Sequence, residues 1–287
     1  MTAPAPDILL AGLHKAADDV TSDVAKLTDE DVKAPSALPG WTRGHVLAHL
    51  TGISNAMARQ LEYAARGETV ELYDGGMDGR NKAIDMAAGH DADTHRADLS
   101  AALARAIRAF DALPGVKDSA ANRTGWWAPI SYRGGVVLDG GLALWRELVI
   151  HNADLLTGRG PETWSRPFCE HLFDFLSARV QPDDRLVLQP LGLPPVSIGS
   201  GTRSTVVSGM ITDMPPGWQD ANQPWAACGR RQLPTAWTCR ISCRGRREPP
   251  RRSSGLRPEI LRPMALRGNP AGRHCHVLPS RGHSRAA

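Results

Sequence analysis

The stretch Leu144-Trp-Arg-Glu-Leu-Val-Ile-His-Asn-Ala-Asp-Leu155 combines the apolar stripe of a helix with ionisable side chains. At about 100° per residue, its leucines share one face with His151, and Glu147 and Asp154 flank that face on the same side. An imidazole and a carboxylate on an apolar face cost free energy unless something pairs with them. The stretch therefore predicts a helix of a bundle core that also holds a polar site.

A second helix, far upstream, offers a partner for this site. Its apolar stripe is formed by Val46, Leu50, Ile53, Met57 and Leu61. His49 lies at the inward edge of the stripe, whereas His45 is turned about 40° further toward solvent and is the weaker candidate. Two helices that present His49, Glu147 and His151 inward can form a three-ligand metal site with an open position, which is the arrangement of catalytic zinc.

The residues alone also allow a simpler interpretation. Buried Glu–His pairs occur without metals, and a glutamate four residues before a histidine is common by chance. Asp154 lies too far along the helix to be a direct ligand, so we expect it to orient a ligand or to handle a proton. Four histidines without a partner at ligand spacing are expected to be surface or ordinary helix residues: His14, His90, His95 and His171.

Hydrophobic periodicity predicts a mainly α fold, with a metal-binding four-helix bundle in residues 1–160. Long helices are expected at about 6–27, 42–66 and 94–113 and in the stretch that bears Glu147, with a short helix at about 80–88. From residue 161 onward the pattern changes to a helix near Phe168, strands at 185–189 and 195–198, and a further helix at 205–213. Residues 161–213 are therefore predicted to be the start of a small, incomplete α/β domain.

The 287 residues divide into two parts of unlike composition. Residues 214–287 contain 14 arginines, no lysine and 3 acidic residues, which gives them a charge of +11, so the preceding 213 residues carry −7 of the net +4. This tail has no amphipathic pattern and no zinc-type cysteine spacing, so we predict that it is disordered and binds no nucleic acid. A single cysteine elsewhere, and no leader or long apolar run, favour a cytoplasmic protein that does not engage a membrane, and we expect a monomer.

Three motifs in a fixed order are more specific than the spacing of the candidate ligands. They are Leu38-Pro-Gly-Trp-Thr-Arg-Gly-His-Val-Leu-Ala-His-Leu50, Tyr73-Asp-Gly-Gly76 and Trp145-Arg-Glu-Leu-Val-Ile-His-Asn-Ala-Asp154. Over about residues 7–213 the chain resembles the mycothiol-dependent maleylpyruvate isomerase family, which belongs to the DinB-like metal-binding helix bundles. The resemblance implies that His49, Glu147 and His151 bind zinc. Related thiol-transferase bundles generally use three histidines, so Glu147 favours the isomerase branch.

The resemblance also implies an activity, with Zn²⁺ and mycothiol as cofactors. The thiolate would add to the double bond of maleylpyruvate, the resulting single bond would rotate, and elimination of the thiol would give fumarylpyruvate. An unsaturated dicarboxylate needs cationic anchors, and Arg80 is the candidate for this role. Asp154 is the candidate catalytic group. Arg146 is expected to point to solvent. The alternatives are a mycothiol S-transferase acting on electrophiles, and a non-catalytic metal-binding bundle.

The abrupt change at residue 214 is typical of a GC-rich gene read out of frame. When 215–221 is back-translated with GC-rich codons, a frame moved by two bases reads Ala-Trp-Leu-Ala-Gly-Arg, which resembles the C-terminal helix of the family. We therefore interpret 214–287 as a frameshift product; the alternative is a lineage-specific basic extension. The interpretation implies an incomplete C-terminal domain and low activity even with zinc bound.

Overall fold

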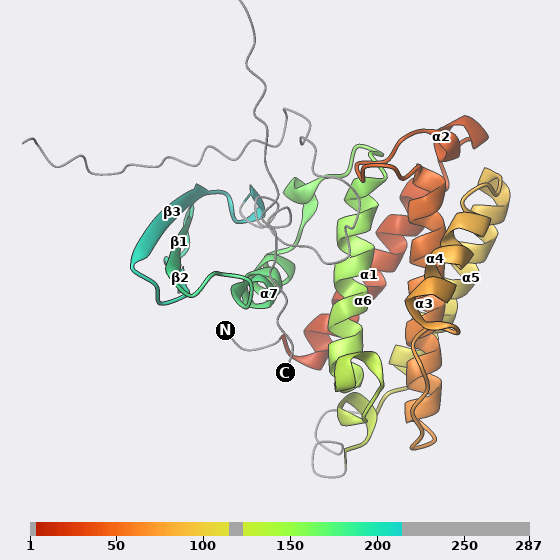
Figure 1. Ribbon diagram of the computed structural model, residues 1–287, viewed down its shortest axis with the longest axis horizontal. Helices are drawn as coiled ribbons and strands as arrows, with labels where there is room; N and C mark the ends of the chain where they lie inside the picture. The colour runs from red at the N-terminus through yellow and green to blue at the C-terminus, as the bar shows by residue number, and fades with distance from the viewer. Residues whose placement is uncertain (1–3, 115–122, 214–287) are drawn as a thin grey trace, which may run out of the picture. The chain divides into compact units, whose positions relative to one another are not determined.

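The computed structural model describes residues 4–114 and 123–213, and its main feature is a bundle of four long helices (Figure 1). These helices are α1 (Pro6–Val24), α3 (Arg43–Ala64), α5 (Ala92–Asp111) and α6 (Val137–Asp154). Helix α3 packs against α5 and α6, and α1 packs against α6 and α5. The predicted mainly α fold with an N-terminal four-helix bundle is confirmed.

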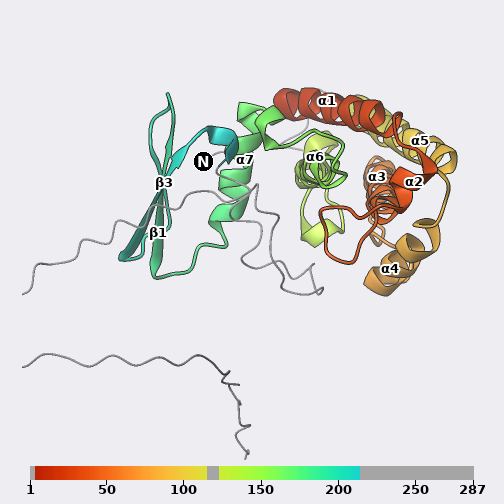
Figure 2. The same ribbon diagram turned by 90° about the horizontal axis from the view of Figure 1, so that it is seen from above.

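Apolar positions at helical spacing enclose the core of this bundle. Its fully buried side chains include Leu9, Leu13, Val20, Val46, Leu50, Met57, Leu99, Phe110, Leu144, Leu148 and Leu155. Each large aliphatic side chain removed from water in this way contributes about 1.5–3 kcal/mol. Helices α3 and α6 are seen end-on next to each other in Figure 2. The two helices that carry the candidate ligands therefore face each other.

The start of α3 is held by a reciprocal cap. The Thr42 hydroxyl accepts a hydrogen bond from the backbone N–H of His45 at 3.3 Å, and His45 Nδ1 accepts one from the backbone N–H of Thr42 at 3.2 Å. Caps of this type typically contribute about 1 kcal/mol. The imidazole of His45 is therefore used in the cap, and it leaves His49 as the histidine of α3 that faces α6.

Two shorter helices lie beside the bundle. Helix α2 (Asp29–Lys33) precedes α3, and α4 (Gly76–Ala87) packs against α3. The sequence predicted the second of these as a helix beginning near residue 80, but it begins at Gly76, four residues earlier. Arg80 consequently lies within a helix that is fixed on α3.

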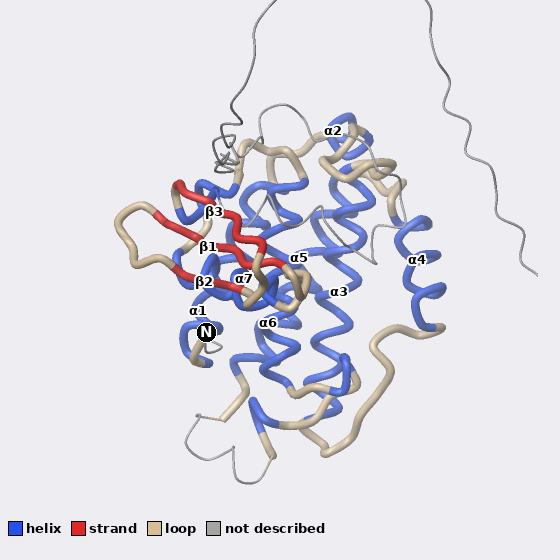
Figure 3. The backbone as a smooth tube through the Cα atoms, turned by 60° about the vertical axis from the view of Figure 1, so that its left-hand side comes forward, coloured by secondary structure: helices blue, strands red, loops and turns tan. Residues whose placement is uncertain are grey.

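Residues 161–213 form one α-helix, a small sheet and two short 3-10 helices, η4 (Pro161–Thr163) and η5 (Ile211–Asp213). Helix α7 (Arg166–Ser177) is followed by β1 (Asp184–Pro190), β2 (Val196–Ile198) and β3 (Arg203–Gly209), in the order β2-β1-β3. The strands are red in Figure 3; β1 pairs antiparallel with β2 and parallel with β3.

One predicted element of this region is wrong. Residues 205–213 were expected to begin a helix, but Thr205, Val206 and Val207 lie in β3. Branched side chains at Cβ favour a strand, and the pairing of β3 with β1 over seven positions overrides any helical periodicity.

Residues 214–287, predicted as a disordered basic tail and interpreted as a frameshift product, lie outside the described residues. Within 4–114 and 123–213, none of the helices is both long and apolar enough to cross a membrane.

Candidate metal centre

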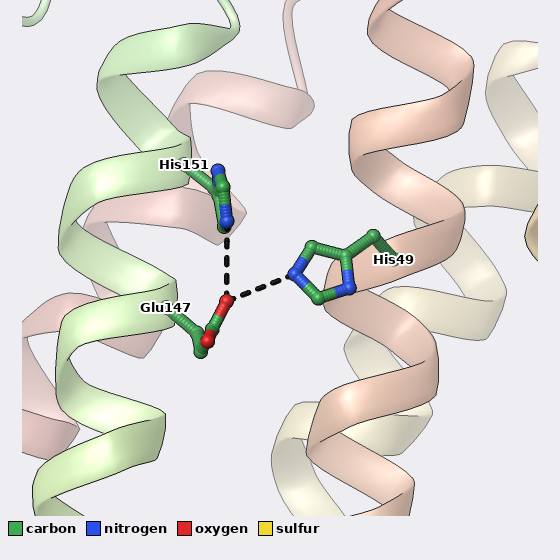
Figure 4. Close-up of side chains that lie close together, drawn as sticks. All are labelled: His49, Glu147 and His151. Atoms are coloured by element: carbon green, nitrogen blue, oxygen red, sulfur yellow. Dashed lines mark hydrogen bonds and ion pairs between the residues drawn. The ribbon is translucent and has the colours of Figure 1, made fainter. Parts of the chain in front are cut away.

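His49, Glu147 and His151 converge between α3 and α6 (Figure 4). Glu147 Oε2 lies 2.9 Å from His49 Nε2 and 3.1 Å from His151 Nε2. One potential ligand atom from each of the three residues lies within 4.8 Å of the others. The structure thus brings together, from helices far apart in sequence, the three residues that the sequence singled out.

The three side chains differ in their exposure to solvent. The side chain of His49 is 6% exposed, that of His151 20% and that of Glu147 33%. The cluster is therefore closed on the side of α3 and open on the side of the glutamate. A metal held by these residues would keep a face accessible to a small molecule, as catalytic rather than structural sites require.

Asp154 holds the far side of the His151 ring. Its Oδ2 lies 2.7 Å from His151 Nδ1, so this nitrogen donates and the ring is turned with Nε2 toward Glu147. A carboxylate on the second nitrogen of a ligand histidine is the usual way of fixing ring orientation in metal sites. Asp154 is placed behind His151 and does not belong to the group of potential ligands.

The Pro39-Gly40-Trp41 loop supports the other histidine. The Trp41 ring lies edge-on to the His49 ring, with 5.9 Å between the ring centroids, and stacks on His45 at 6.0 Å. The loop is tied to the end of α6 by a hydrogen bond of 2.9 Å from the Ala37 N–H to the carbonyl of Asp154. The motif is visible in the sequence, but only the structure shows that its tryptophan packs against a candidate ligand.

Arg80 reaches the cluster from α4. Its Nη2 donates to His49 Nδ1 at 3.0 Å, and its Nη1 donates to Asn81 Oδ1 at 2.9 Å. Tyr73 lies close to the same guanidinium; burial is the largest cause that raises the pKa of Tyr73, to about 12. The phenol therefore remains protonated at neutral pH, and it is a residue of the site that sequence reasoning missed, although it begins the Tyr73-Asp-Gly-Gly76 motif.

A glycine-rich turn sets the position of α4 and hence of Arg80. Gly75 adopts a positive φ of 73°, and a Cβ on Gly79 would lie 1.9 Å from the carbonyl oxygen of Asp74. The turn is held on α3 by an ion pair of 2.7 Å between Arg59 and Asp74. Only glycine allows this close approach of the backbone.

The electrostatics of the cluster favour a cation. Burial alone would raise the pKa of Glu147, but the hydrogen bonds from His151 and His49 hold it well below its usual range. Burial would lower the pKa of His151, but Asp154 and Glu147 outweigh this and raise it to about 10. For His49, burial prevails and lowers the pKa. Two carboxylates thus attract positive charge to His151 Nε2, where a metal ion would take the place of a proton.

The donor set fits a divalent metal of the zinc type. It consists of two imidazole nitrogens and one carboxylate oxygen, and the ring of His151 is oriented by a second carboxylate. Two-histidine, one-glutamate sets with a free fourth position are those of catalytic zinc. His49 and His151 cross edge-to-face with 4.8 Å between their ring centroids, so both rings can point a nitrogen at one ion.

The sequence suggested that Arg146 points to solvent, but in the structure it does not. Its Nη1 donates to His171 Nε2 at 2.7 Å, and its guanidinium carbon lies 3.8 Å from the centroid of the Phe175 ring. Helical geometry did place Arg146 away from Glu147, but α7 covers that face of α6. The prediction failed because periodicity along one helix does not show which later element packs on its outer face.

Together the fold and the cluster define the class of protein: a helical bundle whose facing helices hold a histidine–glutamate–histidine site. The model of the mycothiol maleylpyruvate isomerase N-terminal domain matches residues 13–156, half of the chain, and the chain belongs to this family. Among curated protein sequences, none matches significantly.

Two solved structures are similar in fold. They are crystal structures of the mycothiol-dependent maleylpyruvate isomerase and of a histidine-to-alanine mutant of it. Each has a TM-score of 0.63 and 18% sequence identity, and the alignment covers 75% of this chain and 90% of that chain. At this identity the likeness concerns the fold, including residues beyond the bundle.

Proposed function

We propose that the protein catalyses the cis–trans isomerisation of maleylpyruvate to fumarylpyruvate, with zinc and mycothiol as cofactors. The observation that carries this proposal is the open His49–Glu147–His151 cluster in a chain of this family. The substrates are then a small-molecule thiol and an unsaturated dicarboxylate. We further propose that the protein is cytoplasmic, because the single cysteine of residues 1–213 suits a reducing compartment, and that it acts as a monomer.

The ligand residues prepare the site for a thiol. A bound zinc ion would supply the positive charge that keeps a thiol in its thiolate form near neutral pH. Glu147 contributes the negative charge that partly balances the ion, and His49 and His151 contribute neutral nitrogens. Asp154 fixes the ring of His151 through Nδ1 at 2.7 Å, and its carboxylate can accept a proton from behind this ligand. We assign Asp154 to catalysis on this basis.

Arg80 is placed to bind a carboxylate of the substrate. Its guanidinium lies 3.0 Å from the ring of His49, so an anion that it holds would lie beside the cluster. Guanidinium groups bind carboxylates through two parallel hydrogen bonds and so fix orientation as well as position. The Tyr73 hydroxyl lies next to Arg80 and stays protonated, so it can donate a further hydrogen bond to the same carboxylate.

The reaction depends more on the positioning of the substrate than on general acid–base catalysis. A thiolate held at the site would supply a nucleophile that adds to one carbon of the double bond, with the electron pair taken up by the conjugated carbonyl, and that would leave again after rotation about the resulting single bond. No atom is gained or lost. The protein must therefore hold one carboxylate while the other end turns, and a single anchor at Arg80 meets this requirement.

Turnover of maleylpyruvate by the zinc-loaded protein, followed by absorbance with and without mycothiol, tests the proposal. We expect isomerisation that requires the thiol and stops when a chelator removes the metal. Consumption of thiol and electrophile without isomerisation would indicate an S-transferase instead. Absence of both reactions in a protein with stoichiometric zinc would leave a metal-binding bundle and contradict the proposal.

A further inference from the structure

The two histidines of the cluster have opposite partners on their outer nitrogens. His151 Nδ1 faces the carboxylate of Asp154 at 2.7 Å, whereas His49 Nδ1 faces the guanidinium of Arg80 at 3.0 Å. A carboxylate at neutral pH only accepts hydrogen bonds and a guanidinium only donates them. Asp154 therefore requires a proton on Nδ1 of His151. Arg80 requires a lone pair on Nδ1 of His49.

This difference decides which histidine is ready for a metal. A neutral imidazole carries one proton and one lone pair, so the proton on Nδ1 of His151 leaves a lone pair available at Nε2 once the second proton is lost. Because Arg80 can only donate to Nδ1 of His49, this contact places the lone pair of the neutral ring at Nδ1 and its proton at Nε2, the nitrogen that lies 2.9 Å from Glu147 Oε2. A ring in this tautomer cannot bind a metal through Nε2.

We propose that Arg80 is a switch residue: it holds His49 in the metal-free tautomer, and metal binding releases its guanidinium for an anionic ligand. A metal on Nε2 needs a proton on Nδ1, and an N–H group cannot accept from Arg80. The two contacts therefore exclude each other. That the anion is a carboxylate of the substrate rests on the proposed function; the competition between metal and Arg80 does not.

The surroundings of Arg80 allow such a movement. The residue is half-buried on α4, a helix of 12 residues that contacts α3, and its other guanidinium nitrogen already bonds to the side chain of the adjacent Asn81. Within 4–114 and 123–213, no carboxylate lies within ion-pair distance of Arg80. The released guanidinium would thus be a charged group without a counter-ion, beside an open metal site.

Coupling of this kind is reciprocal. If the metal frees Arg80 for an anion, then an anion that pairs with Arg80 must raise the affinity for the metal by the same factor. The prediction concerns binding equilibria and requires no turnover.

Zinc affinity, measured by competition with a chelating dye, tests the proposal. We expect Arg80→Gln to bind zinc about tenfold more tightly than the wild type, the size of a hydrogen bond from a charged donor. Lys82→Gln, which removes one positive charge from an exposed position of the same helix, should bind zinc like the wild type. Maleate, a small cis-dicarboxylate, should tighten zinc binding by the wild type and by Lys82→Gln but not by Arg80→Gln.

Nitrogen-15 NMR of the imidazole rings separates the tautomer from a simple effect of charge. We expect the His49 proton on Nε2 in the metal-free wild type and on Nδ1 after zinc is added. A proton on Nδ1 in the metal-free protein, or zinc affinity that is equal or lower in Arg80→Gln, would overturn the proposal. Neither result would bear on isomerase activity. Conversely, the switch stands if these shifts occur in a protein that does not turn over maleylpyruvate.

Discussion

Glu147 Oε2 lies 2.9 Å from His49 Nε2 and so joins α6 to α3 across 98 positions of sequence. The same oxygen lies 3.1 Å from His151 Nε2, so one carboxylate oxygen links both imidazoles. Any property that depends on all three residues should therefore be most sensitive to the glutamate. The first prediction follows from this position.

We expect Glu147→Ala to lose bound zinc and isomerase activity while the bundle keeps its helical content. The side chain is one-third exposed and contributes little to the core, so its removal should not unfold the protein. Metal content by mass spectrometry and helicity by circular dichroism measure the two effects. Glu170→Ala, which removes a carboxylate from α7, is the matched control and should keep its zinc. Stoichiometric zinc in Glu147→Ala would show that the ligand assignment is wrong.

Asp154→Asn should reduce turnover more than it reduces metal affinity. The asparagine oxygen can still accept from His151 Nδ1, where the aspartate does so at 2.7 Å, but the negative charge behind the ligand is lost. Changes in such outer partners commonly cost about 10–100-fold in activity or affinity, and we expect at least a tenfold loss in kcat with zinc still stoichiometric. A normal rate with normal zinc content would exclude Asp154 from the mechanism.

The stability of the protein should decrease as the pH is lowered, because His171 is buried. Burial and then the charge of Arg146 lower its pKa to about 3, whereas in the unfolded chain it is about 6.5. Below about pH 6.5, His171 therefore binds a proton in the unfolded chain but not in the folded protein. The contribution of His171 to the free energy of unfolding is fully present above this pH and is lost as the pH falls toward 3. The upper limit of the slope is about 1.4 kcal/mol per pH unit.

His171→Gln should make this dependence shallower, because an amide oxygen can accept from Arg146 and takes up no proton. Urea unfolding at pH 6.5 and 5.0 should show a difference between the two pH values that is about 2 kcal/mol smaller than in the wild type. An unchanged dependence in His171→Gln would mean that His171 is not the group responsible.

Gly79→Ala should impair substrate binding and should also lower the stability of the protein. Its Cβ would lie 1.9 Å from the backbone carbonyl oxygen of Asp74, so the backbone of the turn before Arg80 must shift, and Arg80 shifts with it. We expect KM for maleylpyruvate to rise about tenfold, the effect of misplacing one charged hydrogen bond, with zinc content unchanged. Gly52→Ala, where a Cβ meets no atom within 4 Å, is the control and should leave KM unchanged.

The bundle could be predicted because its signals are local. The stripes of α1, α3, α5 and α6 repeat within each helix, and the caps at Thr42 and Gly-rich turns stand next to the elements that they delimit. The predictions that failed concern residues whose structure depends on contacts with segments far along the chain. Residues 205–209 became part of a strand because β1 was available for pairing, and Arg146 was covered because α7 packs on α6.

By itself the sequence determined that Glu147, His151 and Asp154 would lie on one face of one helix, since residues three and four apart are neighbours at the helical period. It also singled out His49 as the inward histidine of a second helix. Only the tertiary structure decided that these helices face each other, that Trp41 packs on His49, and that Arg80 donates to its Nδ1. The reason is physical: helical period sets the direction of a side chain relative to its own axis, whereas the partner it meets depends on how separate helices pack.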